Sequence, residues 1–175
     1  MPKTTLSFVF ATGLLLGLGL TLCARADDKA KKDWSHLQVI TYASGLTGFF
    51  DPATGRVVTV DQMRADLVLM KEFGFNAVRT SHAPNAPELY DLCDELGLYV
   101  VDETNFESHA FITSLCHDPR YLAAWMDRGS RMVQRDRNHP SVILWSIGNE
   151  IPEQGSADGW KEARRLTALF HAEDP

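Results

Sequence analysis

Residues 142–150 read Val-Ile-Leu-Trp-Ser-Ile-Gly-Asn-Glu, an apolar run that ends in an amide and a carboxylate. A continuously apolar run is typical of a parallel strand that is covered on both faces. Polar side chains are tolerated where such a strand emerges at its C-terminal end, which is where α/β barrels build their active sites. The pattern favours Glu150 as a catalytic acid, although a carboxylate that merely begins a surface loop would look the same.

Strand and helix patterns alternate along the chain from Thr59 onward. Short apolar segments near 75–80, 98–102 and 142–148 are each followed by a helical pattern, and 39–42 could be one earlier strand. Consecutive βα units of this kind form a parallel sheet. We predict an α/β fold, a partial (β/α)8 TIM barrel of about the first four βα units, because a whole barrel takes ~250 residues. An open doubly wound sheet would fit the alternation, but no Gly-rich phosphate loop follows the first strand.

The predicted helices are marked by their ends as well as by their apolar faces. Thr59 and Gln62 fit a capping box at the start of the first helix, and Pro87 suits the first turn of the second. A third helix is predicted over about 119–138. The last is predicted over about 156–172, with an inward face made of Trp160, Ala163, Leu166 and Phe170.

The first 26 residues have the layout of a secretory signal peptide. A positively charged start is followed by an apolar stretch over 6–22 and by small residues, Ala24 and Ala26, at a cleavage position. Residues 27–38 then read as a polar leader, and we predict that the folded domain covers 39–175. These features predict a secreted or periplasmic protein.

The chain is acidic, with a formal net charge of −6 at pH 7. An acidic exported domain is a poor candidate for binding nucleic acid or an anionic membrane, so we expect neither as a partner. Cys93 and Cys116 remain after the predicted cleavage, and an oxidising compartment would permit a bridge between them. The sequence contains no C-x-x-C motif, so it gives no indication of a structural zinc site.

Each predicted strand ends in polar side chains. These are Arg79, Thr80, Ser81 and His82, then Asp102, Glu103, Thr104 and Asn105 with Glu107 and His109 beyond, and finally Asn149 and Glu150. Because the C-terminal ends of parallel strands meet on one face, these groups can share a pocket. Crowded charges there should have displaced pKa values, which mark active sites. An ion network that only closes the end of the sheet would have the same composition.

Glu107 and His109 stand two residues apart, so their side chains point the same way if the segment is extended. Together with Glu150 they could hold a divalent cation, and carboxylate oxygens favour Mg²⁺. A Glu-x-His pair on an exposed loop without a metal is the alternative.

Four segments resemble glycoside hydrolase family 2, the group of bacterial β-galactosidases and β-glucuronidases. They are Phe-Asn-Ala-Val-Arg-Thr-Ser-His at 75–82, Asp-Leu-Cys-Asp at 91–94, Gly-Leu-Tyr-Val-Val-Asp-Glu at 97–103, and the stretch from Arg-Asp-Arg-Asn-His-Pro-Ser at 135–141 through Gly-Asn-Glu at 148–150. The resemblance runs from about 51 to 175. It implies that 39–175 is part of a TIM-barrel catalytic domain with a retaining β-glycosidase mechanism.

The resemblance also implies roles for individual residues. Glu150 would be the general acid/base, Asn149 would contact the sugar's 2-hydroxyl, and His82 would bind substrate. Arg79 and Asp102 complete the candidate substrate-binding set. The substrate would be a β-galactoside or a related sugar.

A magnesium site is implied by one branch of the family and not by another. Glu107-Ser108-His109-Ala110 stands where the Mg²⁺-dependent β-galactosidases carry two metal ligands, with the acid/base glutamate as a third. Ile-Pro-Glu-Gln at 151–154, however, looks like a branch without the metal pair. The resemblance therefore leaves Mg²⁺ open, with Glu107, His109 and Glu150 as its candidate ligands.

Two departures from the family bear on mechanism. The stretch 42–50 replaces the first-strand segment that carries a substrate-contacting histidine. The family's nucleophilic glutamate belongs to the seventh strand, beyond Pro175, whereas a retaining glycosidase needs two carboxyl groups about 5–5.5 Å apart. Arg79, which would lie beside that nucleophile, must then pair with Asp102, Glu103 or water.

We therefore expect a secreted fragment of a family 2 β-glycosidase that carries the acid/base half and shows little or no turnover as an isolated chain. The open edges of its sheet are an association hazard. One alternative is a non-catalytic carbohydrate-binding half-barrel that uses His82, Asn149 and Glu150. The other is a truncated product that does not fold stably.

Overall fold

The computed structural model describes residues 4–5, 35–42, 57–108, 111, 115–151 and 156–175. Its strands form one parallel sheet in the order β1-β5-β4-β3-β2. They are β1 (Thr4–Thr5), β2 (Val39–Tyr42), β3 (Ala77–Thr80), β4 (Tyr99–Glu103) and β5 (Val142–Ser146). The helices are α1 (Val60–Glu72), α2 (Pro87–Leu96), α3 (Pro119–Asp136) and α4 (Ala157–Glu173), with a 3₁₀ turn η1 (Leu115–His117).

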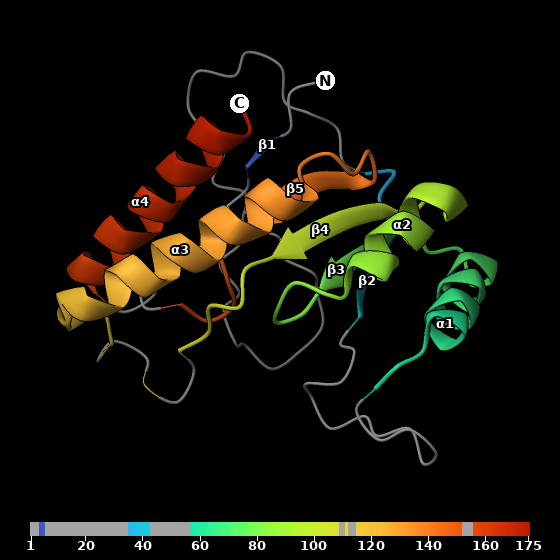
Figure 1. The fold of residues 1–175 in the computed structure, drawn as a ribbon, viewed down its shortest axis with the longest axis horizontal. Helices are drawn as coiled ribbons and strands as arrows, with labels where there is room; N and C mark the ends of the chain where they lie inside the picture. Colours follow the sequence, from blue (N-terminus) through green and yellow to red (C-terminus); the bar gives the residue numbers. More distant parts are fainter. Residues whose placement is uncertain (1–3, 6–34, 43–56, 109–110, 112–114, 152–155) are drawn as a thin grey trace.

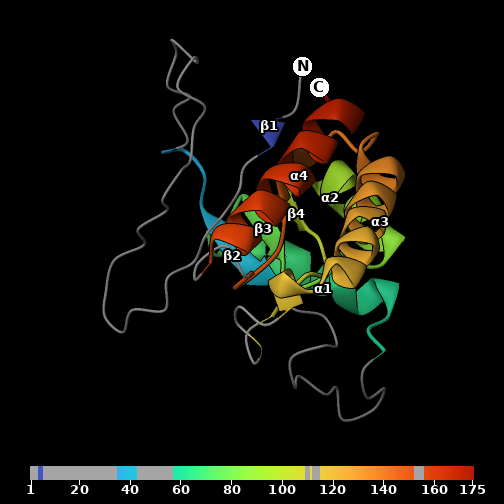
Figure 2. The ribbon, with the colours of Figure 1, turned by 90° about the vertical axis from the view of Figure 1, so that its left-hand side faces the viewer.

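The helices lie together on one side of the sheet, and α3 runs beside α4 (Figures 1 and 2). From β2 onward every strand is followed by a helix, and strands consecutive in the chain are neighbours in the sheet. This is the arrangement of successive βα units, with the helices on the outer face of a curving parallel sheet. The predicted α/β class and its four parallel βα units are confirmed.

The helix ends follow the local signals in the sequence. Thr59 and Gln62 form the predicted capping box of α1. Pro87 occupies the first turn of α2, and Gly97 ends that helix at a φ of 70°, in the left-handed region. Asp118 caps α3 by accepting a hydrogen bond from the Arg120 backbone N–H.

The inward face of α4 is partly as predicted. Ala163, Leu166 and Phe170 are buried, but Trp160 is 45% exposed, with the Arg164 guanidinium 5.5 Å from its ring centre. Trp160 is thus wrongly assigned to the core. A Cβ at Gly129 of α3 would lie 2.6 Å from the Phe170 ring, so this glycine is what lets α3 and α4 approach closely.

The core fills the space between the sheet and its helices. Trp145 of β5 is fully buried in it, and its indole N–H donates to Asp174 Oδ2 at 2.8 Å, which ties β5 to the end of α4. Cys93 and Cys116 are both buried as free thiols, so the bridge that the sequence left open is not formed.

The predicted signal peptide (1–26) and polar leader (27–38) fall mostly outside the described residues. Thr4 and Thr5 are described, and they pair in parallel with Leu144 and Trp145 at the edge of β5. Over the described ranges, we find no helix with the length and apolar character needed to cross a bilayer.

Candidate functional site

The C-terminal ends of β3, β4 and β5 bring five polar residues together. They are Arg79, His82, Glu103, Glu107 and Asn149, and we call them the strand-end cluster. The sheet register explains part of the grouping. Arg79 pairs with Val101 of β4, and Glu103 pairs with Ser146 of β5. Since paired residues and residues two apart share a face, Arg79 and Glu103 lie on the same side of the sheet.

Glu103 is the centre of the strand-end cluster and is fully buried. Its Oε2 lies 2.6 Å from Arg79 Nη2 and accepts a 2.7 Å hydrogen bond from the Ser146 hydroxyl. Its Oε1 lies 2.8 Å from His82 Nδ1. A buried carboxylate with this many partners holds an arginine and a histidine in fixed positions.

Asn149 extends the cluster toward Glu107. Its Oδ1 accepts a 3.1 Å hydrogen bond from Arg79 Nη2, and its amide nitrogen lies 3.4 Å from Glu107 Oε1. Asn149 is buried whereas Glu107 is exposed. The chain of contacts thus leads from the buried carboxylate outward to solvent.

The backbone at 148–150 has the geometry that places Asn149 and Glu150. Gly148 has a φ of 144°, and a Cβ there would lie 2.4 Å from the Phe106 carbonyl oxygen, so only glycine fits. Asn149 N–H donates to that same carbonyl at 2.9 Å, and an isolated parallel bridge joins Glu107 to Asn149. Segments 42 residues apart in the chain are therefore locked side by side.

Glu150 is half-buried, and its φ of 45° is in the left-handed region that non-glycine residues rarely adopt. The Ser108 hydroxyl donates to its backbone carbonyl at 2.9 Å. Unusual backbone conformations held by surrounding contacts concentrate at functional sites. Glu150 therefore stands beside Asn149 at the end of β5, where the apolar run predicted it.

Asp102 belongs to a different environment, and we withdraw it from the substrate-binding set. It neighbours Glu103 on β4 but points to the opposite face, where Tyr90 OH donates to its Oδ1 at 2.6 Å and Thr80 Oγ1 donates to it at 3.1 Å. It has no exposed surface. Successive side chains on a strand alternate between faces, so only one of the two acids could join the cluster.

A displaced pKa does occur, but on this helix-facing side. Burial raises the pKa of Asp102 well above its ordinary value, and the neighbouring Asp136 raises it further through a side-chain hydrogen bond and its charge. Burial also raises the pKa of Tyr90, with Asp102 adding to the effect.

Two of the three candidate metal ligands, Glu107 and Glu150, are among the described residues. Glu107 lies beside Asn149, the residue before Glu150, and carboxylates are donors that suit Mg²⁺. His109, the third candidate, lies outside the described residues. The chemistry of Glu107 and Glu150 is compatible with the predicted ion.

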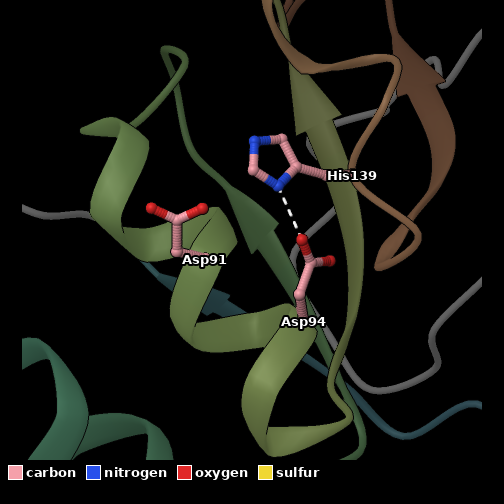
Figure 3. Close-up of side chains that lie close together, drawn as sticks. All are labelled: Asp91, Asp94 and His139. Atoms are coloured by element: carbon pink, nitrogen blue, oxygen red, sulfur yellow. Dashed lines mark hydrogen bonds and ion pairs between the residues drawn. The ribbon is translucent and has the colours of Figure 1, made fainter.

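A second acidic cluster lies at the other end of the sheet, where β5 begins (Figure 3). Asp91, Asp94 and His139 have potential ligand atoms within 4.8 Å of one another. Both oxygens of Asp94 are already engaged, one 2.6 Å from His139 Nδ1 and the other accepting from the Ser141 backbone N–H at 2.8 Å. Asp94 of α2 thus fixes the position of the loop that leads into β5.

Comparison with known proteins identifies the fold and the lineage. The sequence model for the glycosyl hydrolases family 2 TIM barrel domain matches residues 49–175. The chain belongs to glycosyl hydrolase family 2. The predicted resemblance and the partial barrel are thereby confirmed.

Relatives within family 2 are close over this region. A β-galactosidase of Aeromonas hydrophila subsp. hydrophila is 52% identical over 115 residues, which cover 63% of this chain and 11% of that protein. A β-galactosidase of Pectobacterium atrosepticum is 55% identical over 101 residues, covering 57% of this chain and 10% of that protein. The chain thus spans about a tenth of the length of the curated relatives it matches.

Solved family 2 structures also superpose on this one. A β-glucuronidase from Ruminococcus gnavus in complex with uronic deoxynojirimycin matches with a TM-score of 0.69 at 28% identity, covering 79% of this chain and 23% of that one. The same enzyme in complex with D-glucuronic acid matches with a TM-score of 0.66.

Sequence reasoning named every member of the strand-end cluster except Glu103 as a site residue. The signal that could have found it is parity along the strand. If Arg79 points to the site side of the sheet, an acid that forms an ion pair with it must point to that side too. Side chains alternate along a strand, so only one of the consecutive acids Asp102 and Glu103 can do so. The register that selects Glu103 is a tertiary property.

Proposed function

We propose that this chain supplies the acid/base half of the active site of a retaining family 2 β-glycosidase that acts on β-galactosides or related sugars. The observation that carries the proposal is the strand-end cluster, in which buried Glu103 joins Arg79 to His82. Arg79 in turn donates to Asn149, the residue before Glu150. The relatives named above, which include β-galactosidases, support the choice of sugar.

In this proposal Glu150 protonates the leaving glycosidic oxygen and then activates water, as the acid/base of a retaining pair does. Asn149 and His82 contact sugar hydroxyls, and Arg79 stabilises negative charge at the reacting centre. Glu103 does not attack the sugar, because its two oxygens are committed to Arg79, Ser146 and His82. The attacking carboxylate is a second group, which the family places on a later strand.

Sugar binding is the first test of the proposal. Galactose, lactose and glucuronic acid are titrated calorimetrically into the purified 175-residue protein. We expect saturable binding of a galactoside that is lost in Asn149→Ala and in His82→Ala. Gln134→Ala, at an exposed position of α3, is the matched control and should bind as the parent does. Absence of heat at millimolar concentrations of all three sugars would contradict the proposal.

Turnover separates the acid/base half from a complete enzyme. With an aryl β-galactoside we expect no hydrolysis above buffer from the 175-residue protein alone. Robust hydrolysis that disappears in Glu150→Gln would show that the attacking carboxylate lies within these residues. Saturable binding with no turnover in any assembly that contains the remaining barrel strands would favour the carbohydrate-binding alternative.

Mg²⁺ is the proposed cofactor, with Glu107, His109 and Glu150 as its ligands. A bound Mg²⁺ would supply positive charge beside the acid/base residue. We expect a calorimetric Mg²⁺ titration to saturate and to be abolished in Glu107→Gln, while Glu88→Gln on α2 leaves it unchanged. Equal binding by the two variants would remove Glu107 from the ligand set.

Export is proposed from the residues at the N-terminus. Expression with residues 1–26 in place should give a protein in the periplasm or medium that begins at Asp27, as read by N-terminal sequencing. Recovery of an intact N-terminus would argue against cleavage and would leave β1 paired with the edge of β5.

A further inference from the structure

Behind the strand-end cluster, on the helix-facing side of β4, four polar residues form a second network. Asp102 lies between Thr80 of β3, Tyr90 of α2 and Asp136 of α3. Asp102 and Asp136 have no exposed surface. Two carboxyl groups buried against each other cannot both be ionised without a large repulsion.

The hydrogen bonds give the two acids different surroundings. Both oxygens of Asp136 accept from the Arg135 guanidinium, at 2.6 and 2.7 Å, so a cation lies directly beside this carboxyl group. Asp102 Oδ1 already accepts from Tyr90 and Thr80, while Oδ2 is buried with no donor of its own. A hydrogen bond between two carboxyl groups requires a proton, and Oδ2 of Asp102 is where it can reside.

The network reaches the candidate site by two routes. Thr80 Oγ1 donates to Asp102 and accepts the backbone N–H of Glu103 at 3.0 Å, so it couples the two neighbouring acids. Tyr90 OH, which donates to Asp102, also accepts the backbone N–H of Asn85 at 2.9 Å. Arg135 donates to the Asn85 carbonyl at 3.0 Å. Asn85 belongs to the turn between β3 and α2 that carries His82.

We propose that Asp102 is a protonated positioning residue, which shares its proton with Asp136 and, through Thr80 and Tyr90, holds Glu103 and the His82 turn in place. The proton stays on Asp102 Oδ2, the negative charge stays on Asp136, and Arg135 balances that charge. The network touches no substrate and acts only through Glu103 and His82. Its link to sugar binding rests on the proposed function, whereas its protonation state does not.

The groups that face Asp102 all bear on its protonation. Asp136 and Arg135 come from α3, Tyr90 comes from α2, and Thr80 comes from β3. Burial is the largest influence and raises the pKa of Asp102, so the folded protein keeps a proton that the unfolded chain has released. Stability from this group is therefore full below the unfolded pKa and is lost as pH rises through the window up to the folded pKa.

Infrared spectroscopy reads the proton directly. The 175-residue protein labelled with ¹³C-aspartate should show, at neutral pH, an isotope-shifted carbonyl band of a protonated carboxylic acid. That band should be absent from Asp102→Asn. Isotope labelling separates it from Glu162, whose pKa burial raises to about 7. Absence of the band in the parent protein would overturn the proposal. That result is obtained on the parent protein alone, so it does not depend on whether a variant folds.

Thermal melts at several pH values test the protonation of Asp102 independently, through the direction in which Tm changes with pH. An asparagine at 102 keeps the shape, accepts from Thr80 and Tyr90, and donates to Asp136 in place of the proton. We expect the Tm of the parent to fall relative to Asp102→Asn as pH rises above the pKa of an unfolded aspartate, about 3.9. A variant that instead loses Tm at neutral pH, with a parent that is weakest in acid, would mean that Asp102 is ionised.

The positioning role of the Asp102 network is tested by the NMR signals of His82, because a loss of stability alone would not reveal it. Thr80→Val removes the hydroxyl that couples Asp102 to Glu103, and Thr167→Val on α4 makes the same substitution away from the site. The His82 ring signals in NMR should shift in Thr80→Val and stay in place in Thr167→Val and Asp102→Asn, and galactose affinity should fall several-fold only in Thr80→Val. Unmoved His82 signals in Thr80→Val would refute the positioning role. If the parent binds no galactose, the proposed function fails while the infrared, pH and NMR results still decide this inference.

Discussion

Glu103 and Asp102 are consecutive carboxylic acids on β4, yet they have opposite surroundings. Glu103 faces Arg79 and His82 on the side of the candidate site, where a cation balances its charge. Asp102 faces Tyr90 and Asp136 on the side of the helices, where a second acid opposes its ionisation. Both are fully buried. Burial alone therefore does not set the charge of an acid, because the first neighbours decide whether it is compensated.

The two faces of the sheet have different roles. On the site side, charge is kept and used to orient groups that would meet a sugar. On the helix side, hydrogen bonds without net local charge on Asp102 fix the backbone that carries those groups. The following four changes test this difference, from the largest expected effect to the smallest.

Removing the charge on the site side should be the most damaging change. Glu103→Ala removes the carboxylate that balances the charge of the buried Arg79 guanidinium, which should lower the free energy of unfolding by about 3–5 kcal/mol. Urea unfolding at neutral pH measures the loss. Combining it with Arg79→Met should recover much of the lost free energy, because the guanidinium charge is then removed together with the carboxylate that balanced it. A double variant no better than Glu103→Ala would show that the ion pair is not what Glu103 contributes.

Removing one hydroxyl on the helix side should cost less. Tyr90→Phe deprives Asp102 of a 2.6 Å hydrogen bond and leaves the Asn85 N–H without its acceptor, for an expected loss of about 1–3 kcal/mol in unfolding free energy. Tyr121→Phe is the matched control, because Tyr121 is 42% exposed. Equal losses in the two variants would mean that the hydroxyl of Tyr90 is not special.

Displacing the backbone before Asn149 should affect binding more than stability. Gly148→Ala places a Cβ against the Phe106 carbonyl and should cost more than about 1 kcal/mol while abolishing galactoside binding. Gly97→Ala also has a positive φ but meets no atom within 4 Å, so it should cost up to about 1 kcal/mol and leave binding unchanged. Calorimetry and urea unfolding on both variants make the comparison, and retained binding in Gly148→Ala would break it.

Asp94 should show a pH dependence opposite in sign to that of Asp102. Burial acts to raise its pKa, but hydrogen bonds from Ser141 and His139 outweigh burial and lower it. The stability it contributes is present above the unfolded pKa and is lost as pH falls through the folded pKa. Asp94→Asn should lose about 1 kcal/mol at neutral pH and less in acid, in melts across pH. A loss that grows in acid would contradict this sign.

Much of the fold was readable from local signals in the sequence. The capping box at Thr59, Pro87 in a first turn and the apolar run before Asn149 each act over a few residues, so they predicted elements that the structure contains. Trp160 was misassigned because helical spacing places a side chain on a face but does not say whether a neighbour covers it. Arg164, one turn away, lies over the ring instead.

The sequence by itself determined the four βα units, their order, and the polar groups at the strand ends, since hydrophobic period and chain order are local properties. Only the tertiary structure decided that Glu103 joins Arg79 while Asp102 turns to Tyr90 and Asp136. That choice depends on the register between β3, β4 and β5 and on which helices lie behind them. A shift of one residue would exchange the two acids, and no local signal in the sequence sets that register.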